Sequence, residues 1–85
     1  DAPEDPELLS SYGWALHQQG FSEQGLSRVE AALAIAPDHP RALYDKARIL
    51  IDLERFDEAR PLLLRLLEEP SSYQALARRL LQALP

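Results

Sequence analysis

The sequence predicts an all-α fold of five helices arranged as stacked hairpins, and three observations support this prediction. Leucine occurs 17 times and alanine 12 times among the 85 residues, and both residues favour helices. Only four residues are β-branched and threonine is absent, which leaves little from which to build a sheet. Residues of the same kind also recur at a constant offset of 34, the length of a two-helix unit in repeat proteins.

This offset brings small residues onto small ones and apolar residues onto apolar ones. The clearest pairs are Pro6 with Pro40, Leu9 with Leu43, Gly13 with Ala47, Gly25 with Ala59, and Val29 with Leu63. We therefore divide the chain into an acidic N-terminal arm (1–5), a first repeat (6–39) and a second repeat (40–73). Residues 74–85 are either a C-terminal capping helix or the start of a third repeat.

Each repeat contains two predicted helices. In the first repeat, Asp5 is placed to cap a helix that begins at Pro6, because proline suits the first helical position. Apolar residues then follow at helical spacing as far as Gly20, and a second helix extends to Pro37.

The second repeat restarts at Pro40, turns near Glu54 and closes at Pro70. Gln74 follows Ser71 by three residues, which is the spacing of a capping box. This pattern predicts a fifth helix through about residue 84. Helices of this length are marginally stable alone, so each one has to bury its apolar stripe against a neighbour.

Four small residues mark the points where paired helices are expected to cross. Gly13 and Gly25 have the same spacing in the first repeat as Ala47 and Ala59 have in the second. A small side chain at each crossing lets the two backbones approach closely. We expect a larger side chain there to overpack the crossing, at a cost of about 1–3 kcal/mol.

The period and the small residues together resemble the tetratricopeptide repeat family, whose pattern is W-x2-L-G-x2-Y…A-x3-F…P. The corresponding segments are Tyr12-Gly13…Leu16 and Lys46-Ala47…Leu50, then Gly25…Val29…Pro37 and Ala59…Leu63…Pro70. A leucine replaces the tryptophan in both repeats, and Pro70 comes one position early. The resemblance covers residues 6–73 and implies a right-handed superhelical array with a concave and a convex face.

In this family the first helix of each pair lines a concave groove that binds extended peptides or partner segments. The resemblance therefore implies that the outward side chains of the first, third and fifth helices contact a ligand. These residues are Ser10, Trp14, His17, Gln18, Arg41, Tyr44, Arg48, Ile51 and Arg78. Aromatic rings beside guanidinium groups suit an acidic peptide or a C-terminal carboxylate, because a guanidinium binds a carboxylate bidentately.

Some of these residues have an equally simple structural interpretation. Arg41 and Arg48 lie within one helical turn of Asp45, and Arg48 also lies one turn before Asp52, so these charges can form a solvated ladder of ion pairs along one helix. Trp14 lies off the apolar stripe, which fits either an anchor for a ligand or a side chain packed against the next repeat.

One mode of recognition in the family is disfavoured. Some members bind chaperone C-termini through a clamp of Lys and Asn side chains that holds two carboxylates. This chain has no Asn, and its one lysine, Lys46, falls toward the helix interface. We therefore expect a protein or peptide partner that is bound in another way.

The sequence does not support an enzyme, a metal site, a cofactor or a nucleic-acid partner. The chain lacks cysteine, and His17 and His39 lie in different parts of the first repeat with no carboxylate cluster between them to complete a metal site. Its three glycines form no phosphate-binding loop. Residues 1–27 carry five acidic residues and no lysine or arginine, which disfavours a phosphate backbone. Membrane insertion is not expected either, because no apolar run approaches the length of a membrane span.

The fifth helix offers a second surface. Its apolar face is broad, whereas the terminal helix of an array normally keeps its outer face polar. The residues concerned are Leu80, Leu81 and Leu84, together with Leu64 of the fourth helix. They indicate either a third repeat cut short or a self-association surface that would give a homodimer.

We therefore predict a non-catalytic scaffold that binds a peptide or partner segment in its groove, within a larger assembly or chaperone-like factor. The alternative is a structural segment that self-associates or stacks on further repeats and has no separate peptide ligand. Eight arginines against one lysine are typical of a GC-rich bacterial genome, for which the compartment would be cytoplasm or periplasm. The chain starts at Asp1 rather than Met, so we expect a longer parent protein.

Overall fold

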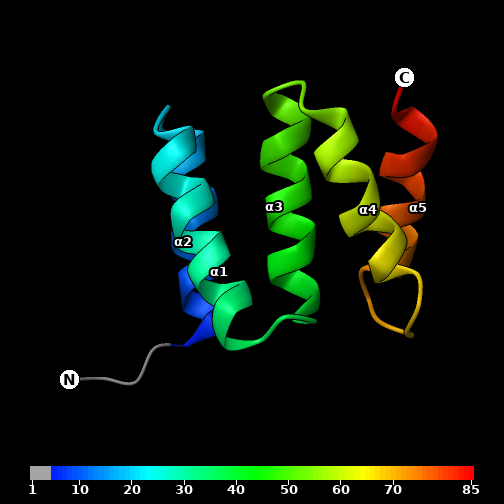
Figure 1. Ribbon diagram of the computed structural model, residues 1–85, viewed down its shortest axis with the longest axis horizontal. Helices are drawn as coiled ribbons and strands as arrows, with labels where there is room; N and C mark the ends of the chain where they lie inside the picture. The colour runs from blue at the N-terminus through cyan, green and yellow to red at the C-terminus, as the bar shows by residue number, and fades with distance from the viewer. Residues whose placement is uncertain (1–4) are drawn as a thin grey trace.

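The computed structural model describes residues 5–85, and these residues form five α-helices that lie side by side along the long axis (Figure 1). The helices are α1 (Pro6–Gln18), α2 (Ser22–Ile35), α3 (Pro40–Asp52), α4 (Phe56–Leu66) and α5 (Gln74–Ala83). Residues 5–85 contain no strand, which confirms the all-α prediction. Of the predicted acidic arm, residues 1–4 lie outside the described residues.

The starts of the helices repeat at the interval found in the sequence. The helices α1, α3 and α5 begin at Pro6, Pro40 and Gln74, and α2 and α4 begin at Ser22 and Phe56. Their ends do not repeat in the same way, since α2 has 14 residues and α4 has 11 residues. The connection that follows α4 is correspondingly longer than the one that follows α2.

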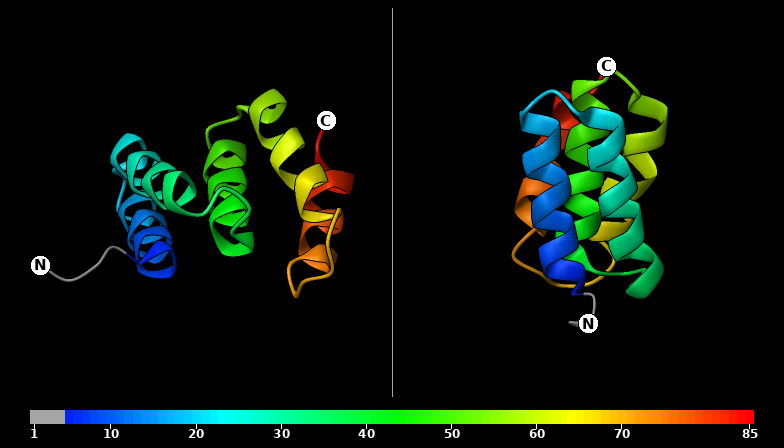
Figure 2. Two further views of the ribbon diagram at one scale, coloured as in Figure 1. Left: turned by 60° about the horizontal axis from the view of Figure 1, so that its bottom comes forward. Right: turned by 90° about the vertical axis from the view of Figure 1, so that its left-hand side faces the viewer.

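Each helix packs on its neighbours in the array. The helices α1 and α2 form one pair and α3 and α4 another, and α3 contacts both helices of the first pair. The end-on view in Figure 2 shows α1 and α5 on one side of the array and α2 and α4 on the other. The buried apolar residues are Leu26, Val29, Ala32, Ala42, Leu43, Ala47, Ile49, Leu50, Ala59, Leu63, Leu66 and Ala77.

The small residues lie at the crossings, as predicted. A Cβ atom placed on Gly13 would lie 2.6 Å from the carbonyl oxygen of Gly25 and 2.6 Å from Cγ2 of Val29. The backbones of α1 and α2 therefore touch at this point, and only glycine fits without a shift. Ala47 and Ala59 of the second pair are both completely buried.

Side chains cap the starts of α1 and α3. Oδ1 of Asp5 accepts a hydrogen bond from the backbone N–H of Glu7 at 2.9 Å, as the sequence predicted. Nδ1 of His39 accepts one from the backbone N–H of Ala42 at 3.4 Å, so an imidazole takes the place of the usual oxygen.

The predicted capping box before α5 is wrong. The residue before the helix is Tyr73, whose side chain makes no capping hydrogen bond. Oγ of Ser71 accepts from the backbone N–H of Tyr73 at 3.2 Å, and Nε2 of Gln74 donates to the carbonyl of Leu67 at 3.0 Å. Both side chains therefore stabilise the long connection after α4 and not the first turn of α5.

Candidate functional site

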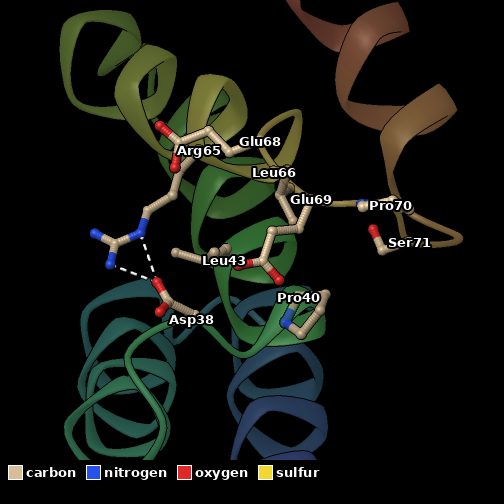
Figure 3. Close-up of a pocket in the computed structure, with 9 residues that line it drawn as sticks. All are labelled: Asp38, Pro40, Leu43, Arg65, Leu66, Glu68, Glu69, Pro70 and Ser71. Carbon is tan, nitrogen blue, oxygen red and sulfur yellow. Dashed lines mark hydrogen bonds and ion pairs between the residues drawn. The ribbon is translucent and has the colours of Figure 1, made fainter.

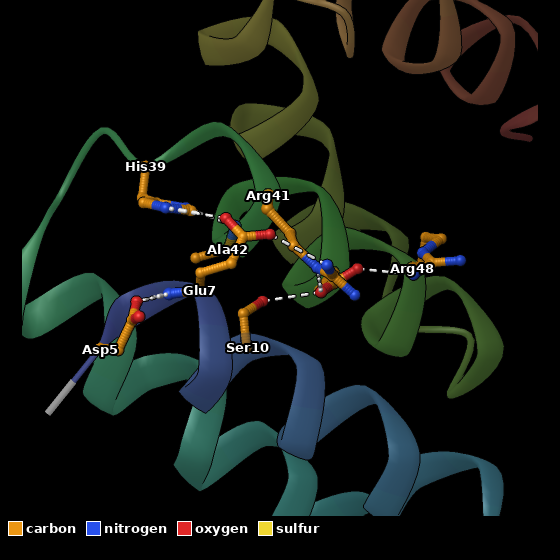
Figure 4. Close-up of polar contacts among 8 residues, drawn as sticks. Asp5, Glu7, Ser10, His39, Arg41, Ala42 and Arg48 are labelled. Carbon is orange, nitrogen blue, oxygen red and sulfur yellow. Dashed lines mark hydrogen bonds and ion pairs between the residues drawn. The ribbon is translucent and has the colours of Figure 1, made fainter.

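A buried carboxylate joins α1 to α3 on the side of the array where the groove was predicted (Figure 4). The side chain of Asp45 is only 1% exposed. It accepts hydrogen bonds from Oγ of Ser10 at 2.7 Å, Nε of Arg41 at 3.2 Å and a terminal nitrogen of Arg48 at 2.6 Å. A buried charge is tolerated only when it is paired and hydrogen-bonded, and these three donors meet that requirement.

This arrangement corrects the assignment of Ser10 to the groove surface. Ser10 has no exposed surface, and its hydroxyl is used by Asp45, so it cannot contact a ligand. A single helix viewed alone places Ser10 on its outer side. The face is covered because α3 packs against α1 there.

The two arginines of α3 already have carboxylate partners. Arg41 binds Oε2 of Glu7 at 3.0 Å as well as Asp45, and these contacts, with the hydrogen bond to Glu7 foremost, raise the pKa of Arg41 above its ordinary value. Arg48 pairs with Asp45 and not with Asp52, although the expected ladder of ion pairs included both carboxylates. Both arginine charges are therefore largely compensated within the protein.

Three aromatic rings and one guanidinium group stack across the array. We call this set the aromatic stack, and its members are Trp14, Arg48, Tyr44 and Tyr73. The guanidinium carbon of Arg48 lies 3.5 Å from the ring centroid of Trp14 and 4.6 Å from that of Tyr44. The ring of Tyr44 is 5.3 Å from that of Tyr73. The stack thus runs from α1 through α3 to the start of α5, and each of its members is half-buried.

Trp14 therefore packs against the next repeat, which was one of its two predicted roles. Since the ring stays partly accessible, a role in binding is compatible with this packing. Nε of Arg48 is buried and has no hydrogen-bond partner among residues 5–85, so stacking and the bond to Asp45 hold its guanidinium in place.

His17 serves mainly as a link between helices. Its Nε2 lies 2.7 Å from Oδ2 of Asp52 on α3, and its Nδ1 lies 2.8 Å from Oγ of Ser22 on α2. Its side chain is 10% exposed, and its ring packs 5.4 Å from that of Trp14. His17 thus supports the aromatic stack and offers little surface to a ligand.

The remaining predicted groove residues differ in accessibility. Gln18 and Arg78 are exposed, and Ile51 is half-buried. Arg78 occupies the position in α5 that Tyr44 occupies in α3, one period earlier, and it forms no ion pair within the part of the chain that is described. Tyr73 is a member of the stack that was not predicted for this surface. The same period aligns it with His39, directly before the helix, and could have revealed it.

The broad apolar face of α5 is partly covered. Leu80, Leu81 and Leu84 are half-buried and pack against the core, so they do not form the open patch that the sequence suggested. Leu64 of α4 is exposed, as predicted.

Within residues 5–85, no group of three or more histidine, aspartate or glutamate side chains is placed to hold a metal ion. None of the described helices is both long enough and apolar enough to cross a bilayer.

A family model for the tetratricopeptide repeat matches residues 16–84. The chain therefore belongs to the tetratricopeptide repeat family. Repeats of this family generally mediate protein–protein interactions and are typically not catalytic. No curated protein and no solved structure matched the chain.

Proposed function

We propose that this chain binds an extended segment of a partner protein on the face formed by α1, α3 and α5. The observation that carries the proposal is the aromatic stack, which spans these helices and stays partly accessible along its length. Rigid aromatic rings give a large contact area at a small cost in conformational entropy, which makes them effective anchors in interfaces.

The charges beside the stack favour a ligand with an apolar or aromatic residue next to an acidic one. Arg41 and Arg48 are compensated by Glu7 and Asp45, so their attraction for a further carboxylate is weakened. Arg78 is exposed and has no such partner in the described part of the chain. An acidic side chain or a C-terminal carboxylate of the partner would therefore be held by Arg78, with the neighbouring apolar side chain on the stack.

Trp14 is the only tryptophan, so its fluorescence reports directly on this face. We expect acidic peptides that contain an aromatic residue to change the emission of Trp14 in a saturable way, and the same peptides with Asn and Gln in place of Asp and Glu to bind more weakly. Arg78→Gln should remove the preference for acidic peptides, while Tyr44→Ala should weaken binding of both kinds. Arg60→Gln on α4 is the matched control. Saturable binding of no peptide would overturn the proposal.

A second function, stacking on another helical hairpin, is favoured by the outer face of α1. Leu8 is 67% exposed and Tyr12 is 52% exposed. The equivalent positions of the second repeat are Ala42, which is buried, and Lys46, which pairs with Glu30 of α2 at 3.3 Å. Leu8 and Tyr12 thus lie at positions that the next repeat uses for its contacts with a neighbouring helix hairpin.

Sedimentation velocity at several protein concentrations tests this second function. We expect self-association that is lost in the Leu8→Ser/Tyr12→Ser variant and kept in Ser11→Ala. A strict monomer at all concentrations would exclude self-association through this face.

A further inference from the structure

A hollow of about 70 Å³ opens at one end of the helices, between the α2–α3 connection and the α4–α5 connection (Figure 3). None of the residues that line it belongs to the aromatic stack. Its existence follows from the irregularity of the second repeat. The helix α4 is almost one turn shorter than α2, so a loose connection through Pro70 replaces the last turn of the helix.

The floor of the hollow is apolar. Leu43 of α3 and Leu66 of α4 lie at its base and are only 3% and 4% exposed. The rings of Pro40 and Pro70 also line it. A side chain that enters the hollow would therefore be in contact with hydrocarbon along its length.

The rim of the hollow is acidic. Nε of Arg65 donates to Oδ1 of Asp38 at 2.7 Å across one edge, so these two charges compensate each other. Glu68 and Glu69 also line the hollow, are exposed, and take part in no ion pair among the described residues. The net charge around the opening is consequently negative.

We propose that this hollow receives a lysine or arginine side chain from a partner protein. Long cationic side chains lay their methylene groups along apolar surface and keep the charged end near water. Here the methylene groups would contact Leu43 and Leu66, and the charged end would lie between Glu68 and Glu69. A partner that used both surfaces would present an acidic residue to α5 and a basic residue to the hollow.

Nuclear magnetic resonance of the backbone amides tests the proposal with four capped tripeptides. These are acetyl-Gly-Xaa-Gly amides in which the central residue is Arg, Lys, norleucine or Glu, each added to millimolar concentration. We expect the Arg and Lys peptides to shift the amides of residues 41–43, 66–69 and 71 in a saturable way. Norleucine, which has the methylene groups without the charge, should bind several-fold more weakly, and Glu should give no saturable shift there.

Two double variants distinguish the effect of the acidic rim on binding from the effect of the protein's overall charge. Glu68→Gln/Glu69→Gln should weaken binding of the Arg peptide about fivefold, the combined effect of two exposed charge contacts. Glu23→Gln/Glu54→Gln removes the same charge at the opposite end of the helices and should leave binding unchanged. Any one of three results would overturn the proposal. The two double variants lose binding of the Arg peptide equally, the norleucine and Arg peptides bind equally well, or the Arg peptide shifts none of the amides around the hollow. Each of these results leaves the binding of acidic peptides to the aromatic stack unaffected.

Discussion

Ser10 of α1 donates a hydrogen bond of 2.7 Å to Asp45 of α3, and both side chains are buried. The contact links the first repeat to the second, beside the polar contacts that Glu7 and His17 of α1 make with Arg41 and Asp52 of α3. It also orients Asp45 toward Arg48, which lies over the ring of Trp14. A single hydroxyl group in the interface thus contributes to the position of the aromatic stack.

Replacement of this hydroxyl should destabilise the protein. In Ser10→Ala, the buried carboxylate of Asp45 loses one of its three donors, which costs about 1–3 kcal/mol of unfolding free energy. Urea unfolding measures the loss, and Ser11→Ala on the same helix is the control, expected to change stability by no more than about 0.5 kcal/mol. Equal effects of the two substitutions would show that the buried bond contributes nothing specific.

The crossing of α1 and α2 should not accept a methyl group. In Gly13→Ala the new Cβ would meet the carbonyl oxygen of Gly25 at 2.6 Å, so the backbones have to separate. We expect a loss of about 1–3 kcal/mol, even though alanine favours a helix by about 1 kcal/mol over glycine. Urea unfolding should show the opposite preference at the second crossing, where Ala47→Gly loses about 1 kcal/mol by propensity alone.

The ends of α1 and α3 allow a reciprocal test. Gly20 and Glu54 are equivalent positions of the two repeats, and both have positive φ, 97° and 61°. The N–H of the following residue reaches back to a helix carbonyl in each case, at 2.9 Å for Phe21 and 2.8 Å for Arg55. Since glycine adopts this conformation without strain, Glu54→Gly should stabilise the protein by about 1 kcal/mol, and Gly20→Glu should destabilise it by a similar amount. Thermal unfolding measures both, and a destabilising Glu54→Gly would contradict the argument.

The predictable part of the fold is the part that depends on residues close together in the chain. Proline at the start of α1 and α3 and small residues at the crossings act locally or through a fixed spacing, so the period alone predicts them. Tyr73 shows what the apolar stripe alone does not predict. It continues the stripe of the fifth helix in the sequence, yet it lies directly before α5, as His39 lies before α3, and its ring packs on Tyr44.

The site was less predictable because it depends on contacts between repeats. A helical projection places Ser10 outward and lets Arg48 pair with either Asp45 or Asp52 of its own helix. In the structure both side chains converge on Asp45, whose burial depends on how closely α1 and α3 pack. The accessible members, such as Arg78, were easier to predict, because no later element of the described chain covers them.

The exposed ion pair of Arg55 and Glu58 should make a small contribution to the free energy of unfolding that is lost in acid. The hydrogen bond from Arg55 lowers the pKa of Glu58 below its ordinary value of 4.5. A lowered pKa contributes stability that is present above the unfolded value and is lost as the pH falls through the folded value. Glu58→Gln should therefore reduce stability slightly at pH 7, and this difference from the parent should vanish near pH 3. Urea unfolding at both pH values measures it, and a difference that persists in acid would indicate another cause.

Replacement of Arg48 by lysine should separate its charge from its planar shape. Lysine keeps a positive charge near Asp45 but cannot lie flat over Trp14, so we expect Arg48→Lys to cost about 1 kcal/mol and to reduce the near-ultraviolet circular dichroism of Trp14. Arg60→Lys, at an exposed ion pair with Asp57, is the control and should change neither quantity. If Arg48→Lys kept the dichroism of the parent, the guanidinium would not be what orders Trp14. Arg48→Leu should be more harmful than Arg48→Lys, because it also removes a charged partner from the buried carboxylate.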